Sequence, residues 1–342
     1  MKNILKSEKT ISRRRLLASG VAALFAPAVA AQTAAWSGVR AAAAALPQCH
    51  AVLILQDGES VLRETFRGPP EGRAVPIKSV SKSIVAALTG AAIDRGEIRD
   101  VRATLGQVSP GLIPQGADPG VAGLTIENLV TLQAGLERTS GANYGEWVSS
   151  ANWVANALSR PFVATPGARM LYSTGSTHVL GAVLADVSGQ SLLQLARDRL
   201  GAPLGFDVPA WTRDPQGRYL GGNEMALTLD AMALIGEMYR LGGRWQGRQV
   251  ISTDWIRQSM TARTRSPFSG MDYGYGWFLG RTRGDAFALA RGYGGQIIFV
   301  MPARRLTIAL TSDPTRPARS GGYFGDLMQL IEGHVVPSAQ TA

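Results

Sequence analysis

The chain has 342 residues, of which 45% are hydrophobic, and carries a formal net charge of +10. This length and apolar content suit one large globular domain or two ordinary ones and exclude disorder for most of the chain. The basic residues are spread thinly, without a Lys/Arg run, which argues against a nucleic-acid partner. The single cysteine, Cys49, excludes an internal disulfide and a cysteine-cluster metal site, and we expect a buried thiol.

Residues 1–30 have the order of an export signal: a charged segment, an apolar run and a small-residue ending at Ala28-Val29-Ala30. The double arginine at 13 and 14, followed by two leucines, is typical of a twin-arginine signal, with an ordinary Sec signal as the alternative. The apolar run is short for a bilayer span of roughly 20 residues and is broken by Pro27. We therefore expect signal removal, no stable membrane anchor and a periplasmic mature protein.

Residues 31–47 form an Ala-rich linker that is either a short helix or a flexible lead-in. The segment "HAVLILQDGESVLRETFRG" then predicts a β-hairpin around Asp57-Gly58, and "QIIFVMPARRLTIALTSD" predicts a second around Pro302-Ala303. Apolar residues at helical spacing predict helices within 125–136, 151–160, 175–189, 229–243 and 323–335. The predicted fold is α+β, with one domain over residues 48–342. In it, an antiparallel sheet from about 48–75 and 270–342 packs in an α/β sandwich with a helical insertion of about 79–265.

The stretch "VPIKSVSKSIVAALTG", residues 75–90, places Lys82 three residues after Ser79. Apolar residues recur at helical spacing as far as the stop at Gly96, so Ser79 is predicted at the N-cap or in the first turn of a helix. Three residues are nearly one helical turn, which brings the lysine amine within reach of the serine hydroxyl. A desolvated lysine is a suitable base for a serine nucleophile. A helix-capping serine beside a solvated lysine is the alternative interpretation.

The choice of cations favours the catalytic interpretation. After residue 30, lysine occurs only at Lys78 and Lys82, and every other basic residue is arginine. A lysine where arginine is otherwise used indicates a side chain that must lose its proton. Lys78 is expected to face solvent. His178, inside an apolar helix, is interpreted as a core or surface residue rather than as a triad base.

Three further segments accompany the Ser79 helix: "LTIENLVTLQAGL", "PGARMLYSTGSTHVLG" and "RGYGGQIIFVMP". Together they resemble the serine β-lactamase and penicillin-recognising family over about residues 50–335, specifically its class C-like esterase and amidase branch, which includes 6-aminohexanoate-dimer hydrolases. The resemblance implies a β-lactamase/transpeptidase-like fold and an acyl-enzyme on Ser79, without metal or cofactor. It also implies that Lys82 and Tyr172 transfer protons, with Lys82 as the cation that stabilises a Tyr172 phenolate.

The resemblance further implies an oxyanion hole formed by the backbone N–H groups of Ser79 and Tyr293. Gly292 and Gly294 would permit the close approach of the chain there. These positions, with Thr174, form the expected substrate-binding set.

Two positions depart from the family pattern. Thr174 stands where the Tyr-x-Asn motif has its carboxamide, and the segment Ala290-Arg291-Gly292 lacks the lysine of Lys-Thr-Gly. Arg291 either attracts a carboxylate or points to solvent, and Glu146 either holds a substrate ammonium or is a solvated helix-start acid.

We therefore expect a hydrolase of small-molecule amides or esters rather than of β-lactams. The alternatives are a true β-lactamase or D-amino-acid peptidase and, in another class, a non-catalytic penicillin-binding-like receptor module. The sequence indicates no particular oligomeric state.

Overall fold

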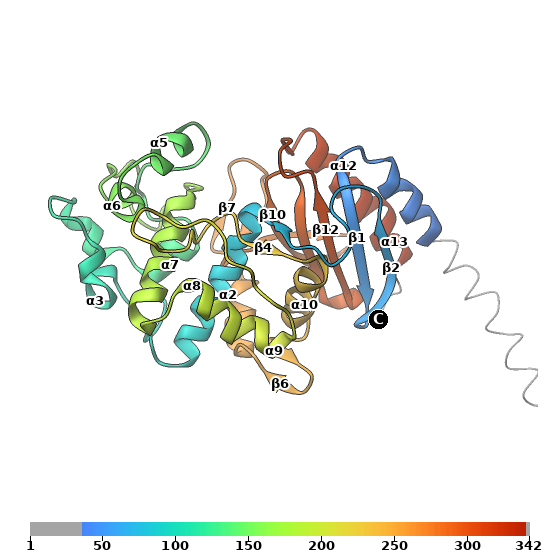
Figure 1. Ribbon diagram of the computed structural model, residues 1–342, viewed down its shortest axis with the longest axis horizontal. Helices are drawn as coiled ribbons and strands as arrows, with labels where there is room; N and C mark the ends of the chain where they lie inside the picture. Colours follow the sequence, from blue (N-terminus) through green and yellow to red (C-terminus); the bar gives the residue numbers. More distant parts are fainter. Residues whose placement is uncertain (1–35, 340–342) are drawn as a thin grey trace, which may run out of the picture.

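A computed structural model describes residues 36–339, and its centre is an eight-stranded sheet that is antiparallel throughout (Figure 1). The strand order is β2-β1-β12-β11-β10-β9-β8-β7, so both ends of the domain contribute to one sheet. The strands are β1 (Cys49–Gln56), β2 (Glu59–Thr65), β7 (Thr264–Arg265), β8 (Asp272–Tyr273), β9 (Phe278–Thr282), β10 (Asp285–Gly292), β11 (Gln296–Met301) and β12 (Leu306–Ser312). Two short ladders lie outside the sheet: β3 (Val75–Pro76) with β4 (Ala226–Leu227), and β5 (Arg244–Trp245) with β6 (Arg248–Gln249). The predicted α+β class with an antiparallel sheet is confirmed.

Both predicted hairpins are present. Asp57 and Gly58 have φ of +56° and +82°, the left-handed pair that a two-residue turn with the strands' own twist requires. The second hairpin joins β11 to β12 through a 3-10 turn at Pro302–Arg304 and Arg305 at φ +50°. The predicted export signal lies outside the described residues.

The helices lie mainly between the two sheet-forming segments. They are α2 (Ser81–Asp94), α3 (Leu105–Val108), α4 (Ile126–Val130), α5 (Tyr144–Val148), α6 (Trp153–Leu158), α7 (Thr174–Ser188), α8 (Leu192–Ala196), α9 (Ala202–Leu204), α10 (Leu229–Arg240), α11 (Thr253–Ser259), α12 (Tyr323–Leu330) and α13 (Val336–Ser338). Among the described residues no single helix is long and apolar enough to cross a membrane, although the bent pair Thr174–Ser188 and Leu192–Leu204 passes on length and composition.

The structure changes one sequence expectation and decides between the two alternatives for another. The helix predicted over 125–136 ends at Val130, because Leu132 and Gly135 take positive φ and Gly135 packs where a Cβ would lie 2.3 Å from the carbonyl oxygen of Ala164. Of the two alternatives for the Ala-rich stretch, its described part has the short helix rather than the flexible lead-in. Residues 36–45 form a helix whose Trp36 and Val39 are buried in the core.

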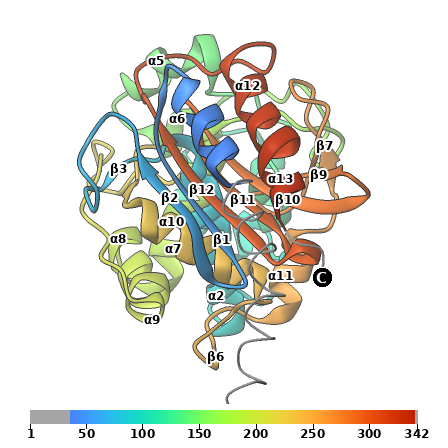
Figure 2. The same ribbon diagram turned by 90° about the vertical axis from the view of Figure 1, so that its right-hand side faces the viewer.

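The sheet separates two hydrophobic cores. Alternate residues of β1 point to opposite faces: Leu53 and Leu55 belong to the core that includes α2, α7 and α10, whereas Val52 and Ile54 belong to the core that includes the 36–45 helix and α12. Figure 2 shows the 36–45 helix, α12 and α13 over that second face. The first core buries α2 between the sheet and the helical insertion, and the start of α2 therefore lies at the boundary between the two parts.

Candidate active site

The predicted nucleophile lies in a short 3-10 turn, Lys78–Val80, that leads directly into α2. Ser79 was expected at the N-cap or in the first turn of one helix, and the structure makes Val80 the N-cap. Lys78 has φ of +52°, a left-handed conformation that costs a non-glycine residue about 1–3 kcal/mol. The turn places the Ser79 hydroxyl on a cavity wall, with its Oγ 3.1 Å from the Nζ of Lys82.

Lys82 is only 3% exposed, and its amine has three polar neighbours. Nζ lies 3.1 Å from the Ser79 Oγ, 2.7 Å from the carbonyl oxygen of Gly222 and 3.4 Å from the Thr174 Oγ1. Burial disfavours the charged form and lowers the pKa of Lys82 from 10.5 to about 7. An amine that is largely neutral slightly above this value is able to take the proton of a neighbouring hydroxyl.

Tyr172 is the third predicted catalytic residue, and its ring centroid lies 4.9 Å from the Lys82 Nζ. Phe278 stacks on the ring with a centroid distance of 6.4 Å. Burial raises the pKa of Tyr172 above its usual value of 10, although a hydrogen bond with Ser79 and the charge of Arg291 oppose the shift. Burial thus acts against the stabilised phenolate that the resemblance implies and favours the protonated phenol. Which of Tyr172 and Lys82 gives the proton and which takes it stays a prediction.

Thr174 begins α7 and is turned toward Lys82 rather than toward solvent, being 4% exposed. Its Oγ1 lies 2.9 Å from the Oγ of Ser140, which also accepts the Thr174 backbone N–H at 2.8 Å. A pair of hydroxyl groups thus occupies the place where the family pattern has a carboxamide. Sequence reasoning missed Ser140, because nothing in "ERTSGAN" marks that serine before the chain folds.

Gly292 ends β10 and presses against the nucleophile turn, where a Cβ would lie only 2.3 Å from the carbonyl oxygen of Ile77. Glycine is required for this approach. Tyr293 follows at the cavity with 52% of its surface exposed. Gly294, at φ +81°, turns the chain toward β11 against the backbone of Asp313 and is not among the residues that line the cavity.

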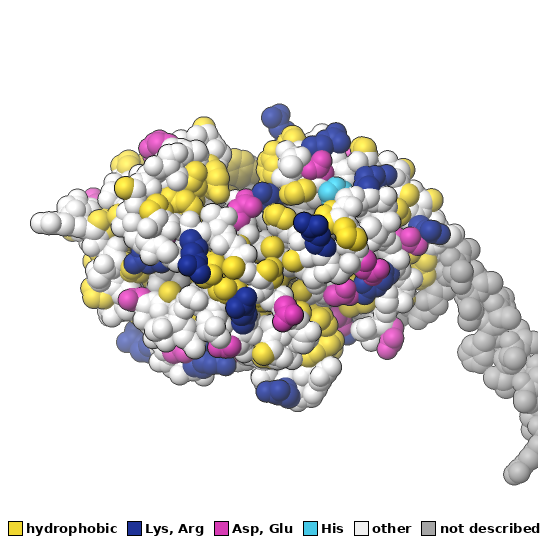
Figure 3. Space-filling model, in the orientation of Figure 1, with side chains coloured by type: hydrophobic (Ala, Val, Ile, Leu, Met, Phe, Trp, Pro, Cys, Tyr) yellow, Lys and Arg dark blue, Asp and Glu magenta, His cyan; other side chains and the backbone are white. Residues whose placement is uncertain are grey.

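These groups open into one cavity of about 580 Å³. Figure 3 shows the surface hollowed between the helical part and the sheet part of the molecule. Aromatic side chains that include Tyr144, Phe268 and Phe278 line it, together with the arginines Arg138 and Arg291. Neither guanidinium forms an ion pair with a carboxylate in the described part of the chain. The Arg291 guanidinium lies 3.4 Å from the ring centroid of Phe324, and burial lowers its pKa to about 10.

Two other expectations are corrected here. Lys78 does not face solvent: it lines the cavity, and its Nζ lies 2.7 Å from the Oε1 of Glu224. Glu146 does not line the cavity. Its side chain is 73% exposed and pairs with Arg160 at 3.2 Å, so the hypothesis of a substrate-ammonium site at Glu146 is wrong. Glu224, which already compensates Lys78, is the only carboxylate among the described residues that line the cavity.

A family model described as Beta-lactamase matches residues 31–329. Among similar solved structures, a protein described as a 6-aminohexanoate-dimer hydrolase from Bacillus anthracis has 16% identity and a TM-score of 0.69, over 85% of this chain and 80% of that one. EstCE1, a hydrolase with promiscuous acyltransferase activity, has 17% identity and a TM-score of 0.71, over 89% and 100%. An octameric penicillin-binding protein homologue from Pyrococcus abyssi has 19% identity and a TM-score of 0.65, over 87% and 77%. These likenesses show a shared fold.

The burial of Lys82 predicts that its amine titrates with a midpoint near the pKa of about 7, because burial acts against the ammonium form. Lysine labelled with ¹³C at Cε makes this measurable by NMR. Only Lys78 and Lys82 lie after residue 9, so few signals appear, and Lys82→Arg assigns the one of interest. A midpoint above pH 9 for that signal would contradict the expected desolvation.

Proposed function

The chain belongs to the Beta-lactamase family, and from that premise we propose that it is a serine hydrolase that cleaves small esters or amides through an acyl-enzyme on Ser79. The observation that carries the proposal is the contact between the buried Lys82 amine and the Ser79 hydroxyl at 3.1 Å. A serine becomes a nucleophile when a base removes its proton, and Lys82 meets the requirements of distance and pKa.

In the proposed acylation step, the neutral Lys82 amine takes the Ser79 proton while Oγ attacks the substrate carbonyl carbon. The carbonyl π electrons move to oxygen and form a tetrahedral oxyanion. The backbone N–H groups of Ser79 and Tyr293 are proposed to bind this oxyanion, beside the close approach of Gly292. When the tetrahedral intermediate collapses, the leaving alkoxide or amine takes a proton from the Tyr172 phenol, which regains one from the Lys82 ammonium.

Deacylation repeats the sequence with water. Lys82, neutral again, takes a proton from a water molecule whose oxygen attacks the acyl carbon, and the Ser79 Oγ leaves with the proton that Tyr172 or Lys82 supplies. All protons are returned, so the cycle needs only water as the second substrate. The Tyr172 pKa, raised by burial, suits this donor role because the phenol remains protonated at neutral pH.

The charges of the cavity wall support an uncharged or anionic substrate. Arg138 and Arg291 have no carboxylate partner in the described part of the chain, and Glu224 is neutralised by Lys78. A substrate carboxylate would find a cation here, whereas a substrate ammonium would meet two arginines. The likeness to a 6-aminohexanoate-dimer hydrolase therefore supports linear amide or ester chemistry but not a dedicated ammonium site.

Single substitutions test the assignment of the chemistry. Ser79→Ala is expected to abolish acylation, and Lys82→Arg to be nearly as damaging because arginine keeps its charge and cannot give up its proton. Tyr172→Phe is expected to lower kcat by about 10²-fold, the range for loss of a general acid or base. Hydrolysis of p-nitrophenyl butyrate and mass spectrometry of the acyl-enzyme measure these effects. Ser269→Ala, on the same cavity wall, is the matched control, and full activity in Lys82→Arg would disprove the base assignment.

The substrate prediction rests on Thr174 and on the missing Lys-Thr-Gly lysine. The Thr174 hydroxyl is already engaged by Ser140 and Lys82, so it leaves the acylamide of a penicillin or cephalosporin unpartnered. Each unpartnered polar group costs about 1–3 kcal/mol. We expect kcat/KM for p-nitrophenyl butyrate to exceed that for nitrocefin by about 10²-fold. Nitrocefin turnover equal to or faster than the ester would indicate a β-lactamase, and absence of any turnover of either substrate would favour the receptor alternative.

Substrate charge provides a separate test of the cavity wall. Among p-nitrophenyl esters of matched length, the one with a terminal carboxylate is expected to react at least about 10-fold faster in kcat/KM than the one with a terminal trimethylammonium. The ratio of the two kcat/KM values should decrease in 0.5 M salt and in the Arg138→Gln or Arg291→Gln variant. Salt screens the attraction between the arginines and the substrate carboxylate, and each substitution removes one of the cations. A preference for the cationic ester would overturn this substrate assignment while leaving the Ser79 chemistry intact.

A further inference from the structure

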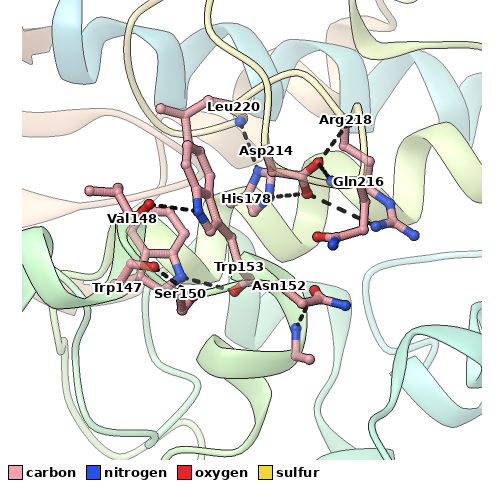
Figure 4. A network of polar contacts seen from close by, with 12 residues as sticks. Trp147, Val148, Ser150, Asn152, Trp153, His178, Asp214, Gln216, Arg218 and Leu220 are labelled. Atoms are coloured by element: carbon pink, nitrogen blue, oxygen red, sulfur yellow. Dashed lines mark hydrogen bonds and ion pairs between the residues drawn. The ribbon is translucent and has the colours of Figure 1, made fainter.

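A wholly buried histidine and aspartate lie beside the cavity without lining it. His178, on α7 one turn beyond Thr174, and Asp214 both have side chains with 0% exposure, and the His178 Nε2 lies 3.1 Å from the Asp214 Oδ2 (Figure 4). Trp147 and Trp153 contact the imidazole edge to face, with ring centroids 5.8 and 5.7 Å away. The proposed chemistry leaves this buried polar pair without a role, and buried polar groups are costly unless every bond is made.

The hydrogen bonds fix which nitrogen of His178 carries the proton. The backbone N–H of Gly221 points to Nδ1 at 3.3 Å, so Nδ1 is an acceptor and the ring proton is on Nε2, where it is donated to Asp214. The other carboxylate oxygen of Asp214 accepts the backbone N–H groups of Gln216 and Arg218 at 2.9 and 2.8 Å. Asp214 thus sets the orientation of the ring, and the ring holds Gly221.

Gly221 leads directly to the carbonyl that contacts Lys82. Gly221 and Gly222 pack so tightly on α7 that a Cβ would lie 2.5 Å from the carbonyl oxygen of Thr177 in the first case and 2.9 Å from that of Thr174 in the second. The Gly222 carbonyl oxygen accepts a hydrogen bond from the Lys82 Nζ at 2.7 Å, which is the shortest of the three contacts of the amine. The segment from Asp214 to Gly222 is therefore fixed at one end by the buried pair and ends at the proposed base.

The far end of this segment is tied to the nucleophile turn. Glu224, at φ +62°, pairs with Lys78, at φ +52°, and the Met225 backbone N–H is 3.2 Å from the Ser81 Oγ. A neutral amine has two N–H groups and one lone pair. With one N–H held by the Gly222 carbonyl and the other directed to Thr174, the lone pair is left for the Ser79 hydroxyl proton.

We propose that His178 and Asp214 are positioning residues that hold Gly221, and through it the Gly222 carbonyl, so that the Lys82 amine presents its lone pair to Ser79. This inference rests on the proposed function. The groups that face Lys82 are the Tyr172 phenol and the Ser79 and Thr174 hydroxyls. Within residues 36–339, Arg218 alone adds a charge beside the buried pair, with its Nη1 3.9 Å from the Asp214 Oδ2.

Asp214→Asn tests the proposal with almost no change of size. If the new amide places its NH₂ opposite Nε2, the proton of His178 moves to Nδ1, where it faces the Gly221 N–H. If the amide is flipped, its oxygen faces Nε2 and its NH₂ faces the backbone N–H groups of Gln216 and Arg218. Either arrangement loses a contact. We expect the Lys82 titration midpoint, measured by ¹³Cε lysine NMR without substrate, to move by about half a pH unit or more. With p-nitrophenyl butyrate as substrate, kcat should fall about 10-fold, whereas KM should change by less than about threefold in either direction.

Glu237→Gln is the matched control, since Glu237 is also a fully buried carboxylate but bonds Arg240 and Thr307 away from the cavity. It should lower the melting temperature without moving the Lys82 midpoint. If Asp214→Asn does not fold, His178→Asn, which keeps an acceptor for Gly221, and His178→Leu, which does not, replace it. The Lys82 titration midpoint should stay unchanged in His178→Asn and should shift in His178→Leu.

An unchanged Lys82 midpoint in a folded Asp214→Asn or His178→Leu protein would overturn the positioning role, as would an equal shift in Glu237→Gln. The NMR readout needs no turnover. Failure of the wild-type protein to hydrolyse any ester would therefore contradict the proposed function separately, while the positioning of Lys82 would still be decided by its titration.

Discussion

The exclusion of water around one lysine is the constraint on which the site depends. Lys82 is 3% exposed, and burial alone brings its pKa to about 7, so no neighbouring charge is needed to free its lone pair. The same burial acts in the opposite direction on Tyr172, whose pKa rises because phenolate is the charged form. One environment thus shifts the pKa values of the two groups in opposite directions, which suits the proposed roles of Lys82 as proton acceptor and Tyr172 as proton donor.

The fold excludes water from the Lys82 amine by bringing together three segments that are distant in the sequence. The turn Lys78–Val80 and the start of α2 carry Ser79 and Lys82, the end of β10 covers that turn at Gly292, and the start of α7 supplies Thr174. Each contact depends on a residue too small to interfere: Gly292 against Ile77, and Gly222 against α7. Because these contacts join segments far apart in the sequence, the site forms only when the sheet and the helical insertion have both assembled.

The sequence predicted those features whose signals are local. The Ser79 and Lys82 spacing, the Asp57-Gly58 hairpin and the long apolar helices follow from periodicity and turn chemistry within a few residues. Other features have no local signal. The helix predicted over 125–136 ends early because of a backbone contact with Ala164, Lys78 turns to a glutamate 146 positions away, and Asp214 reaches His178 across 36 positions. The family resemblance supplied Tyr172, which periodicity alone would have left as a core aromatic.

The use of lysine and arginine along the chain follows from the same constraint. Arginine keeps its proton when buried, and Arg291 with a pKa of about 10 is still charged at neutral pH. A cavity wall that holds a fixed positive charge can therefore use arginine, whereas a general base needs a side chain that loses its proton. Burial favours the neutral form of the Lys82 amine, and its carbonyl and hydroxyl neighbours, unlike a carboxylate, do not hold it in the charged form. A buried acid next to Lys82 would favour the ammonium form. Asp214 lies instead behind an imidazole and a peptide group, so in the proposed positioning role it orients the amine without placing a negative charge beside it.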